Sequence, residues 1–155
     1  MSPLHRANAA KLPAWPLNCC RTICMPTPTP DSLVREFTAL LAAKDLDAAC
    51  AYITEDCEYD NVPIGKAFGP QGLRDTLSGF FQVCDSLDWE IVRQSATGDI
   101  NSAVVLNERI DRFVIKGQTH ELLVAGVYEI HNGKITLWRD YFDQAGLMKA
   151  LAAAS

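Results

Sequence analysis

Residues 137–143 have the sequence Leu-Trp-Arg-Asp-Tyr-Phe-Asp, which predicts a strand. Side chains alternate between the two faces of a strand, so Trp138, Asp140 and Phe142 share one face. A carboxylate between two large aromatic side chains is costly to bury unless it has polar or charged partners, or takes part in chemistry. Asp140 is therefore the first candidate for a functional acid or base.

Two earlier segments offer partners for that carboxylate. Tyr59 and Asn61, and later Arg109 and Asp111, are each two residues apart on predicted strands, so each pair presents its polar groups on one side. Two carboxylates in different environments can serve as general base and general acid, and an arginine between them can orient both. An Arg-x-Asp pair can also be a buried ion pair with no chemical role. The presence of Asp140, Tyr59 and Asn61 in addition to this pair favours catalysis.

Hydrophobic periodicity predicts helices first and strands later, which indicates an α+β fold. The expected helices begin at Asp31 or Ser32, extend from Asp45 or Asp47 to about Ile53, cover Gln71–Cys84, and follow the last strand to Ala154. The expected strands are Cys57–Val62, a strand carrying Leu87, Trp89 and Ile91, Ser102–Phe113, His120–Ile130 and Ile135–Phe142. Residues 65–70 are expected to form a loop.

The Tyr-x-Asn, Arg-x-Asp and Trp-Arg-Asp-Tyr-Phe-Asp elements, in this order and rough spacing, resemble those of the limonene-1,2-epoxide hydrolase family. The similarity runs from about Asp31 to about Ala150 and includes the Gly126–Tyr128 strand and the Asn132-Gly133 turn. It implies a curved, mixed and mainly antiparallel sheet wrapped around N-terminal helices to form a cone with an internal pocket. This is the nuclear-transport-factor-two-like or cystatin-like fold.

The resemblance also implies a role for each of the five polar side chains. Asp140 matches the base that deprotonates a water, and Tyr59 and Asn61 match the groups that hold this water. Asp111 matches the acid that protonates the epoxide oxygen, and Arg109 matches the bridge between the carboxylates. The implied reaction is a one-step hydration of an epoxide to a vicinal diol, with no covalent intermediate, no metal and no organic cofactor.

The substrate implied by the family is a small, largely apolar epoxide, cyclic or terpene-like. The candidate wall residues, each of which could equally be plain core, are Phe80, Cys84, Phe113, Val124, Trp138, Phe142 and Leu147. Two alternatives stay open: a ketosteroid-isomerase-like or polyketide-cyclase-like enzyme on the same fold, and a non-catalytic small-molecule-binding module. The Arg109–Asp111 bridge with a separate Asp140 suits attack by water better than enolisation.

Composition excludes several other classes. A net charge of −5 and a pI near 5.1 argue against nucleic-acid binding, and no apolar run approaches the length that spans a bilayer. The cysteines and histidines do not have zinc-site spacing, so we expect no metal and free thiols. The cysteines are Cys19, Cys20, Cys24, Cys50, Cys57 and Cys84. No export signal is visible, and a cytoplasmic enzyme is expected.

The first 30 residues differ from the remainder. They carry a charge of +3 and six of the eight prolines, which leaves a charge of −8 on the rest of the chain. We therefore expect a Pro-rich basic N-terminal arm over residues 1–30 and a limonene-epoxide-hydrolase-like catalytic domain over residues 31–155. A protein starting at Met25 is expected to fold. Exposed sheet surface, together with family habit, suggests a homodimer.

Overall fold

A computed structural model describes residues 27–154 of the chain, and the expectations for the arm, including Cys19, Cys20 and Cys24, lie outside these residues. The described elements follow one another as α1 (Pro30–Ala42), α2 (Leu46–Cys50), β1 (Ile53–Asn61), β2 (Gly65–Phe68), α3 (Gly69–Val83), β3 (Ser86–Asp99), β4 (Ser102–Ile115), β5 (Gln118–His131), β6 (Lys134–Phe142) and α4 (Gln144–Ala154).

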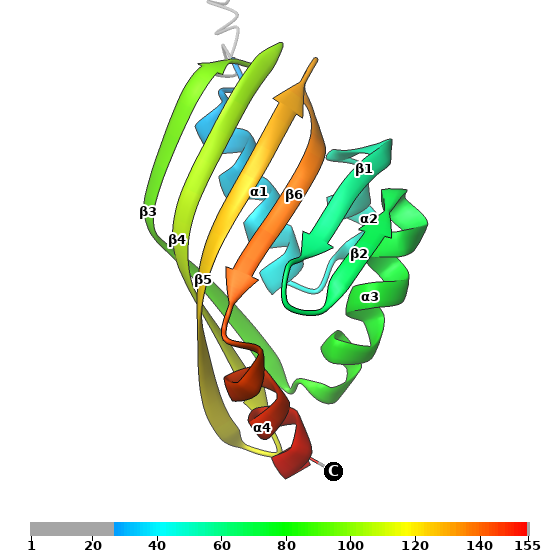
Figure 1. The fold of residues 1–155 in the computed structure, drawn as a ribbon, viewed down its shortest axis with the longest axis vertical. Coiled ribbons are helices and arrows are strands. Elements are labelled where there is room, and N and C mark those ends of the chain that lie inside the picture. Colours follow the sequence, from blue (N-terminus) through cyan, green and yellow to red (C-terminus); the bar gives the residue numbers. More distant parts are fainter. Residues whose placement is uncertain (1–26, 155) are drawn as a thin grey trace, which may run out of the picture.

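The strands form one six-stranded sheet in the order β2-β1-β6-β5-β4-β3. β1 and β6 pair in parallel, and the other neighbouring strands of this sheet pair antiparallel. Figure 1 shows the sheet curving around α1, with α3 beside the β1–β2 hairpin and α4 beyond the end of β6. The predicted α+β fold with a curved, mainly antiparallel sheet and N-terminal helices is confirmed.

Side-chain caps explain where the first two helices begin. The Thr29 side chain accepts a hydrogen bond from the Ser32 amide, and the Ser32 side chain accepts one from the Thr29 amide, so the cap of α1 lies earlier than expected. Asp45 caps α2, in agreement with one of the two predicted starts. The prediction that this helix continues to about Ile53 is wrong, because Ile53 is the first residue of β1.

Residues 65–68, which were expected to lie in a loop, form β2 and pair with β1 from Glu58 to Asn61. α3 then begins at Gly69 rather than at Gln71. Gly69 has φ +64°, and a Cβ at this position would lie 2.3 Å from the carbonyl oxygen of Glu55. Glycine thus permits the sharp turn from β2 into α3. A strand this short contains too few residues to show a clear periodic pattern in the sequence.

The core lies between the helices and the inner face of the sheet. Along β4, alternate residues from Ala103 to Ile115 are buried, as the alternation of the sequence predicts. A second apolar cluster of Cys84, Phe113, Ile115, Leu147 and Ala150 packs α4 against the sheet. Within residues 27–154, none of the helices is long and apolar enough to cross a membrane.

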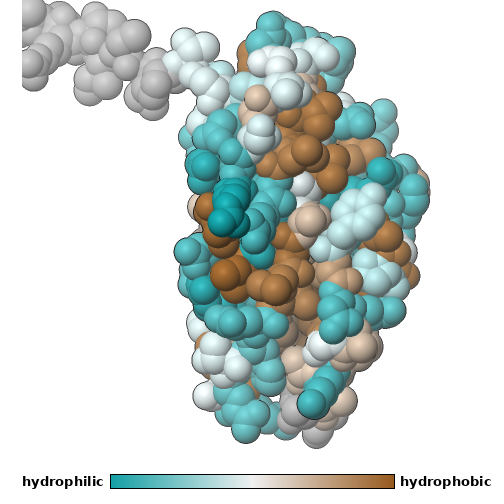
Figure 2. Space-filling view, turned by 60° about the vertical axis from the view of Figure 1, so that its left-hand side comes forward, coloured by the Kyte–Doolittle hydropathy of each residue, from teal (hydrophilic) through white to brown (hydrophobic). Residues whose placement is uncertain are grey.

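Apolar residues also reach the surface. Figure 2 shows apolar patches on one side of the molecule, separated by hydrophilic side chains. Large exposed apolar residues include Val104 and Leu106 on β4 and Leu123 on β5. Exposed sheet surface of this kind is where the homodimer, which stays a prediction, would be formed.

Candidate active site

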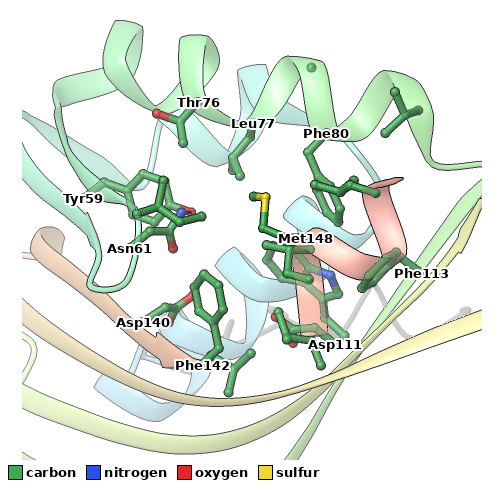
Figure 3. Close-up of a pocket in the computed structure, with 18 residues that line it drawn as sticks. Tyr59, Asn61, Thr76, Leu77, Phe80, Asp111, Phe113, Asp140, Phe142 and Met148 are labelled. Carbon is green, nitrogen blue, oxygen red and sulfur yellow. Dashed lines mark hydrogen bonds between the residues drawn. The ribbon is translucent and has the colours of Figure 1, made fainter. Parts of the chain in front are cut away.

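A cavity of about 420 Å³ lies between the sheet, α3 and α4. Tyr59, Asn61, Asp111 and Asp140 line it (Figure 3), while Arg109 lies behind the carboxylates with no exposed surface. Figure 3 shows Tyr59, Asn61 and Asp140 on one side of the cavity and Asp111 on the other. The structure therefore brings together the five polar side chains singled out in the sequence, from strands β1, β4 and β6.

Arg109 binds both carboxylates. Its Nε and Nη2 donate to the two oxygens of Asp111, each at 3.0 Å. Its Nη2 also donates to Asp140 Oδ2 at 2.7 Å, and its Nη1 donates to Asp140 Oδ1 at 3.3 Å. The planar guanidinium thus holds Asp111 along one edge and Asp140 along another, an arrangement that a lysine ammonium cannot reproduce.

Gly126 makes the reach from Arg109 to Asp140 possible. Arg109 is on β4 and Asp140 on β6, so the guanidinium has to cross β5, where Gly126 pairs with Asp140 on one side and with Asn107 on the other. A Cβ at position 126 would lie 3.0 Å from Arg109 Nη1 and 2.5 Å from Asn107 Oδ1. The missing side chain leaves the space through which the arginine passes.

The two carboxylates have different surroundings. Asp140 Oδ1 accepts a further hydrogen bond, from the indole Nε1 of Trp138 at 2.8 Å. Burial raises the pKa of Asp111 above its ordinary value, although the nearby Arg109 charge opposes that shift. A raised pKa is what a carboxyl group needs if it is to keep a proton for donation to a substrate.

Tyr59 and Asn61 reach the site through the parallel pairing of β1 with β6. Tyr59 lies beside Trp138, and Asn61 lies beside Asp140. The rings of Tyr59 and Trp138 stack with centroids 4.2 Å apart, and Asn61 Nδ2 donates to the Tyr59 hydroxyl at 2.7 Å. Burial raises the pKa of Tyr59 well above its ordinary value, so the phenol keeps a proton that it can donate.

The predicted apolar wall is found in part. Phe80, Phe113, Val124, Phe142 and Leu147 line the cavity, whereas Cys84 and Trp138 do not. Cys84 is buried in the cluster beneath α4, where burial raises the pKa of its thiol to about 11. Trp138 packs in the main core, where Phe37 and Tyr59 cover its ring, and its indole N–H is directed to Asp140.

Several site residues were not anticipated from the sequence. Tyr128 on β5 contacts Arg109, and the Trp89 ring lies under the guanidinium, 5.3 Å from its central carbon. Met148 on α4 projects toward the cavity in Figure 3. Tyr128 lies on the same strand face as Gly126. The sequence of one strand does not reveal its register against its neighbours, so this spacing of a glycine and a tyrosine does not by itself indicate a site residue. Further lining residues are Ile64, Thr76, Leu77, Gly79, Val83, Leu122 and Leu151.

Within the described residues, no group of three or more His, Cys, Asp or Glu side chains is arranged to hold a metal ion. The chemical groups that converge on the cavity are the two carboxylates, the guanidinium behind them, one phenol and one amide. Such a set can move protons and orient a small polar molecule.

Comparisons with known proteins agree on one family. The model of the limonene-1,2-epoxide hydrolase catalytic domain matches residues 28–153. Epoxide hydrolase EphG of Mycobacterium tuberculosis is 35% identical over 118 residues, which is 76% of this chain and 76% of that protein. The structure of a limonene-epoxide-hydrolase-like epoxide hydrolase from M. tuberculosis superposes with a TM-score of 0.61 at 32% identity, over 78% of this chain and 90% of the other.

More distant structures share the fold alone. A protein from Catenulispora acidiphila with a ketosteroid-isomerase-like fold has a TM-score of 0.67 at 18% identity, over 79% of this chain and 92% of that chain. A protein from Shewanella putrefaciens that is described as SnoaL-like has a TM-score of 0.61 at 15% identity, over 79% and 85% of the two chains.

Proposed function

Because this chain belongs to the limonene-1,2-epoxide hydrolase family and is an epoxide hydrolase, we propose that it adds water to a small, largely apolar epoxide. The product is a vicinal diol, and the substrate is cyclic or terpene-like. The proposed reaction takes one step, without a covalent enzyme intermediate, a metal or an organic cofactor. A homodimer is proposed as the working unit.

The cavity wall supports an apolar substrate. Beyond Tyr59, Asn61, Asp111 and Asp140, its lining consists of apolar residues, the indole of Trp89 and the hydroxyl of Thr76. The Thr76 hydroxyl donates to the carbonyl of Gly72, one turn earlier in α3. The wall therefore offers a hydrocarbon body no charged partner, and transferring that body from water into the cavity is favourable.

The placement of the two carboxylates on different sides of the cavity supports the one-step reaction, which we propose to run as follows. Water bound by Tyr59, Asn61 and Asp140 loses a proton to Asp140 as its oxygen forms a bond to an epoxide carbon. The carbon–oxygen bond of the ring breaks, and Asp111 gives its proton to the ring oxygen. The raised pKa of Asp111, caused chiefly by burial, favours the protonated form that this role requires.

Arg109 suits this exchange because it contacts both carboxylates throughout. Before the reaction it faces an ionised Asp140 and a protonated Asp111, and afterwards the two states are reversed. The net charge of the group stays the same, and the negative charge moves along a single guanidinium. A net return of the proton from Asp140 to Asp111 through solvent after product release resets the enzyme.

The single observation that carries the proposal is the guanidinium of Arg109 held between two buried carboxylates at the cavity. The test is the turnover of purified protein on a panel of cyclic, terpene-derived and aryl epoxides, with a β,γ-unsaturated ketone as a comparison substrate. Diol formation from cyclic or terpene-derived epoxides is expected. Isomerisation of the ketone without epoxide turnover would overturn the proposal.

A single turnover in ¹⁸O-labelled water tests the mechanism separately. The label is expected in the diol. Unlabelled oxygen delivered from the protein would show an aspartyl ester intermediate, as in nucleophilic catalysis by a carboxylate, and would refute the one-step reaction.

A further inference from the structure

Tyr128 contacts the centre of the site from β5. It has no exposed surface, its ring stacks on Trp138 at 6.1 Å with an interplanar angle of 9°, and Phe37 packs edge-on at 6.4 Å. Its hydroxyl oxygen accepts a hydrogen bond from Arg109 Nη1. The ring is thus fixed by packing, and the hydroxyl is held at one point beside the guanidinium.

The hydroxyl of Tyr128 completes the hydrogen bonding of Arg109. A guanidinium has five N–H groups in a rigid plane. Four of them are directed to oxygens of Asp111 and Asp140, and the remaining N–H of Nη1 is directed to Tyr128. No other partner of this last N–H is found among the described residues, so the phenol decides where the Nη1 end of the group lies.

The two hydrogen bonds between Arg109 and Asp140 differ in length. Nη2 lies 2.7 Å from Oδ2, whereas Nη1, the atom bound to Tyr128, lies 3.3 Å from Oδ1. Oδ1 instead accepts a hydrogen bond from the indole N–H of Trp138 at 2.8 Å. One oxygen of Asp140 is thus bound closely by the cation, and the other is bound mainly by a neutral donor.

We propose that Tyr128 is a positioning residue that draws Arg109 Nη1 away from Asp140 Oδ1, so that this oxygen is bound only loosely by the cation when the carboxylate accepts a proton from water. Charge-assisted hydrogen bonds are roughly twice as strong as neutral ones, so a full bond from Nη1 would stabilise the ionised carboxylate and weaken it as a base. This inference rests on the proposed role of Asp140.

The surroundings of Asp140 limit what else can change its protonation. The titratable or charged groups that face it are Arg109 and Asp111 from β4, Tyr59 from β1 and Tyr128 from β5. The residues of α3 and α4 that line the cavity carry no charge. Burial raises the pKa of Tyr128, so its hydroxyl stays neutral across the working range. The other partner of this hydroxyl, the side chain of Asn107, carries no charge, so a change confined to the hydroxyl acts on Asp140 through the position of Arg109.

The test is the pH profile of kcat/KM for Tyr128→Phe, which removes one oxygen and keeps the ring. Without the hydroxyl, Nη1 moves toward Asp140 Oδ1, so the acidic limb is expected to shift by about one pH unit to lower pH, with a plateau of kcat/KM about tenfold lower. The matched control is Tyr52→Phe, which removes a hydroxyl bound to Glu36 away from the cavity. The control is expected to leave the profile unchanged.

An acidic limb in Tyr128→Phe that coincides with that of the wild type would overturn the inference, whatever the change in melting temperature. If Tyr128→Phe does not fold, the same pH profile is measured with 3-fluorotyrosine incorporated at position 128 and at no other tyrosine. This analogue retains the hydroxyl but weakens the oxygen as an acceptor, and a smaller shift in the same direction is expected.

Asp140→Asn separates failure of this inference from failure of the proposed mechanism. If Asp140→Asn is inactive and Tyr128→Phe has an unshifted profile, only the role of Tyr128 is refuted. If Asp140→Asn retains wild-type turnover, Asp140 is not the base, and both the mechanism and the role of Tyr128 are refuted.

Discussion

Asp111 and Asp140 bind two different edges of one guanidinium. Asp111 accepts hydrogen bonds from Nε and Nη2 of Arg109, and Asp140 accepts hydrogen bonds from Nη2 and Nη1. Both carboxylates are buried, yet only one can be the proton donor at a given time. Two like charges on a shared cation favour a state in which one group holds a proton. The difference in their surroundings supports the proposed roles of Asp111 as acid and Asp140 as base.

The first prediction concerns the pH dependence of the acid. Burial raises the pKa of Asp111, so its protonated form persists to higher pH than that of an ordinary aspartate. Activity that needs the protonated form is expected to decline as pH rises through this raised pKa. Asp111→Asn should lower kcat by about 10²–10⁴-fold, the usual contribution of a general acid, and remove the basic limb.

Thermal unfolding provides the control for Asp111→Asn. Folded Asp111 binds its proton more tightly than the unfolded chain does, so this group adds stability at low pH that is lost as pH rises between the two pKa values. The melting temperature of the wild type relative to that of Asp111→Asn should therefore fall as pH increases through that range. Near-wild-type turnover of the folded variant would show that Asp111 is not the acid.

The second prediction concerns the bridge. Arg109→Lys keeps a positive charge but loses the planar fork that binds two carboxylates. Its activity is expected to fall nearly as far as that of Arg109→Gln, by about 10²-fold or more, because misplacement of catalytic groups by about 1 Å costs that much. Turnover of both variants, with circular dichroism to verify folding, is the measurement. A fully active Arg109→Lys enzyme would mean that charge alone matters there.

The third prediction concerns the nucleophilic water. Tyr59→Phe and Asn61→Ala should each lower kcat by about tenfold or more, because both weaken the positioning of one water molecule. In the double variant the combined loss should be far smaller than the product of the single losses, since residues that act as a unit are not additive. Multiplicative losses in kcat would instead indicate that the two side chains serve separate steps.

The fourth prediction concerns the passage of Arg109 across β5. Gly126→Ala places a methyl group 3.0 Å from Nη1 and 2.5 Å from Asn107 Oδ1, so the guanidinium has to shift. We expect kcat to fall by about 10²-fold and the free energy of unfolding to fall by about 1–3 kcal/mol.

Ala125→Val is the matched control for Gly126→Ala. It adds methyl groups to the neighbouring residue of β5, whose side chain is exposed on the opposite face. Turnover and melting temperature of the two variants are compared. Equal losses in both would show that bulk on this strand, rather than the position of Arg109, accounts for the effect.

Alternation and turn residues predicted the strands that carry the candidate site, although β1 spans Ile53–Asn61 rather than Cys57–Val62. The alternation along residues 102–113 placed Arg109 and Asp111 on the inner face, where both are buried. Tyr128 escaped notice because its contact with Arg109 depends on the register of β4 against β5, which periodicity along one strand does not contain.

The wall of the cavity was harder to predict than its polar centre. Cys84 and Trp138 belong to apolar faces like those of the lining residues, but packing of α4 and α1 covers them. Conversely, Met148 lines the cavity although nearly half of its surface is exposed. Whether an apolar side chain faces a cavity or a neighbour depends on the angle at which a helix meets the sheet, and hydrophobic patterning does not specify that angle.

The parallel pairing of β1 with β6 determines when the site can first exist. Asn61 and Asp140 are neighbours in the sheet, yet β2, α3, β3, β4 and β5 all lie between them in the chain. On the ribosome, β1 emerges early and has no partner on that side until β6 has been synthesised. Long-range pairing of this kind is slow because the intervening chain has to be ordered first. Epoxide turnover should therefore appear only after β6 has left the ribosome and paired with β1, so it reports whether released chains have reached the native topology.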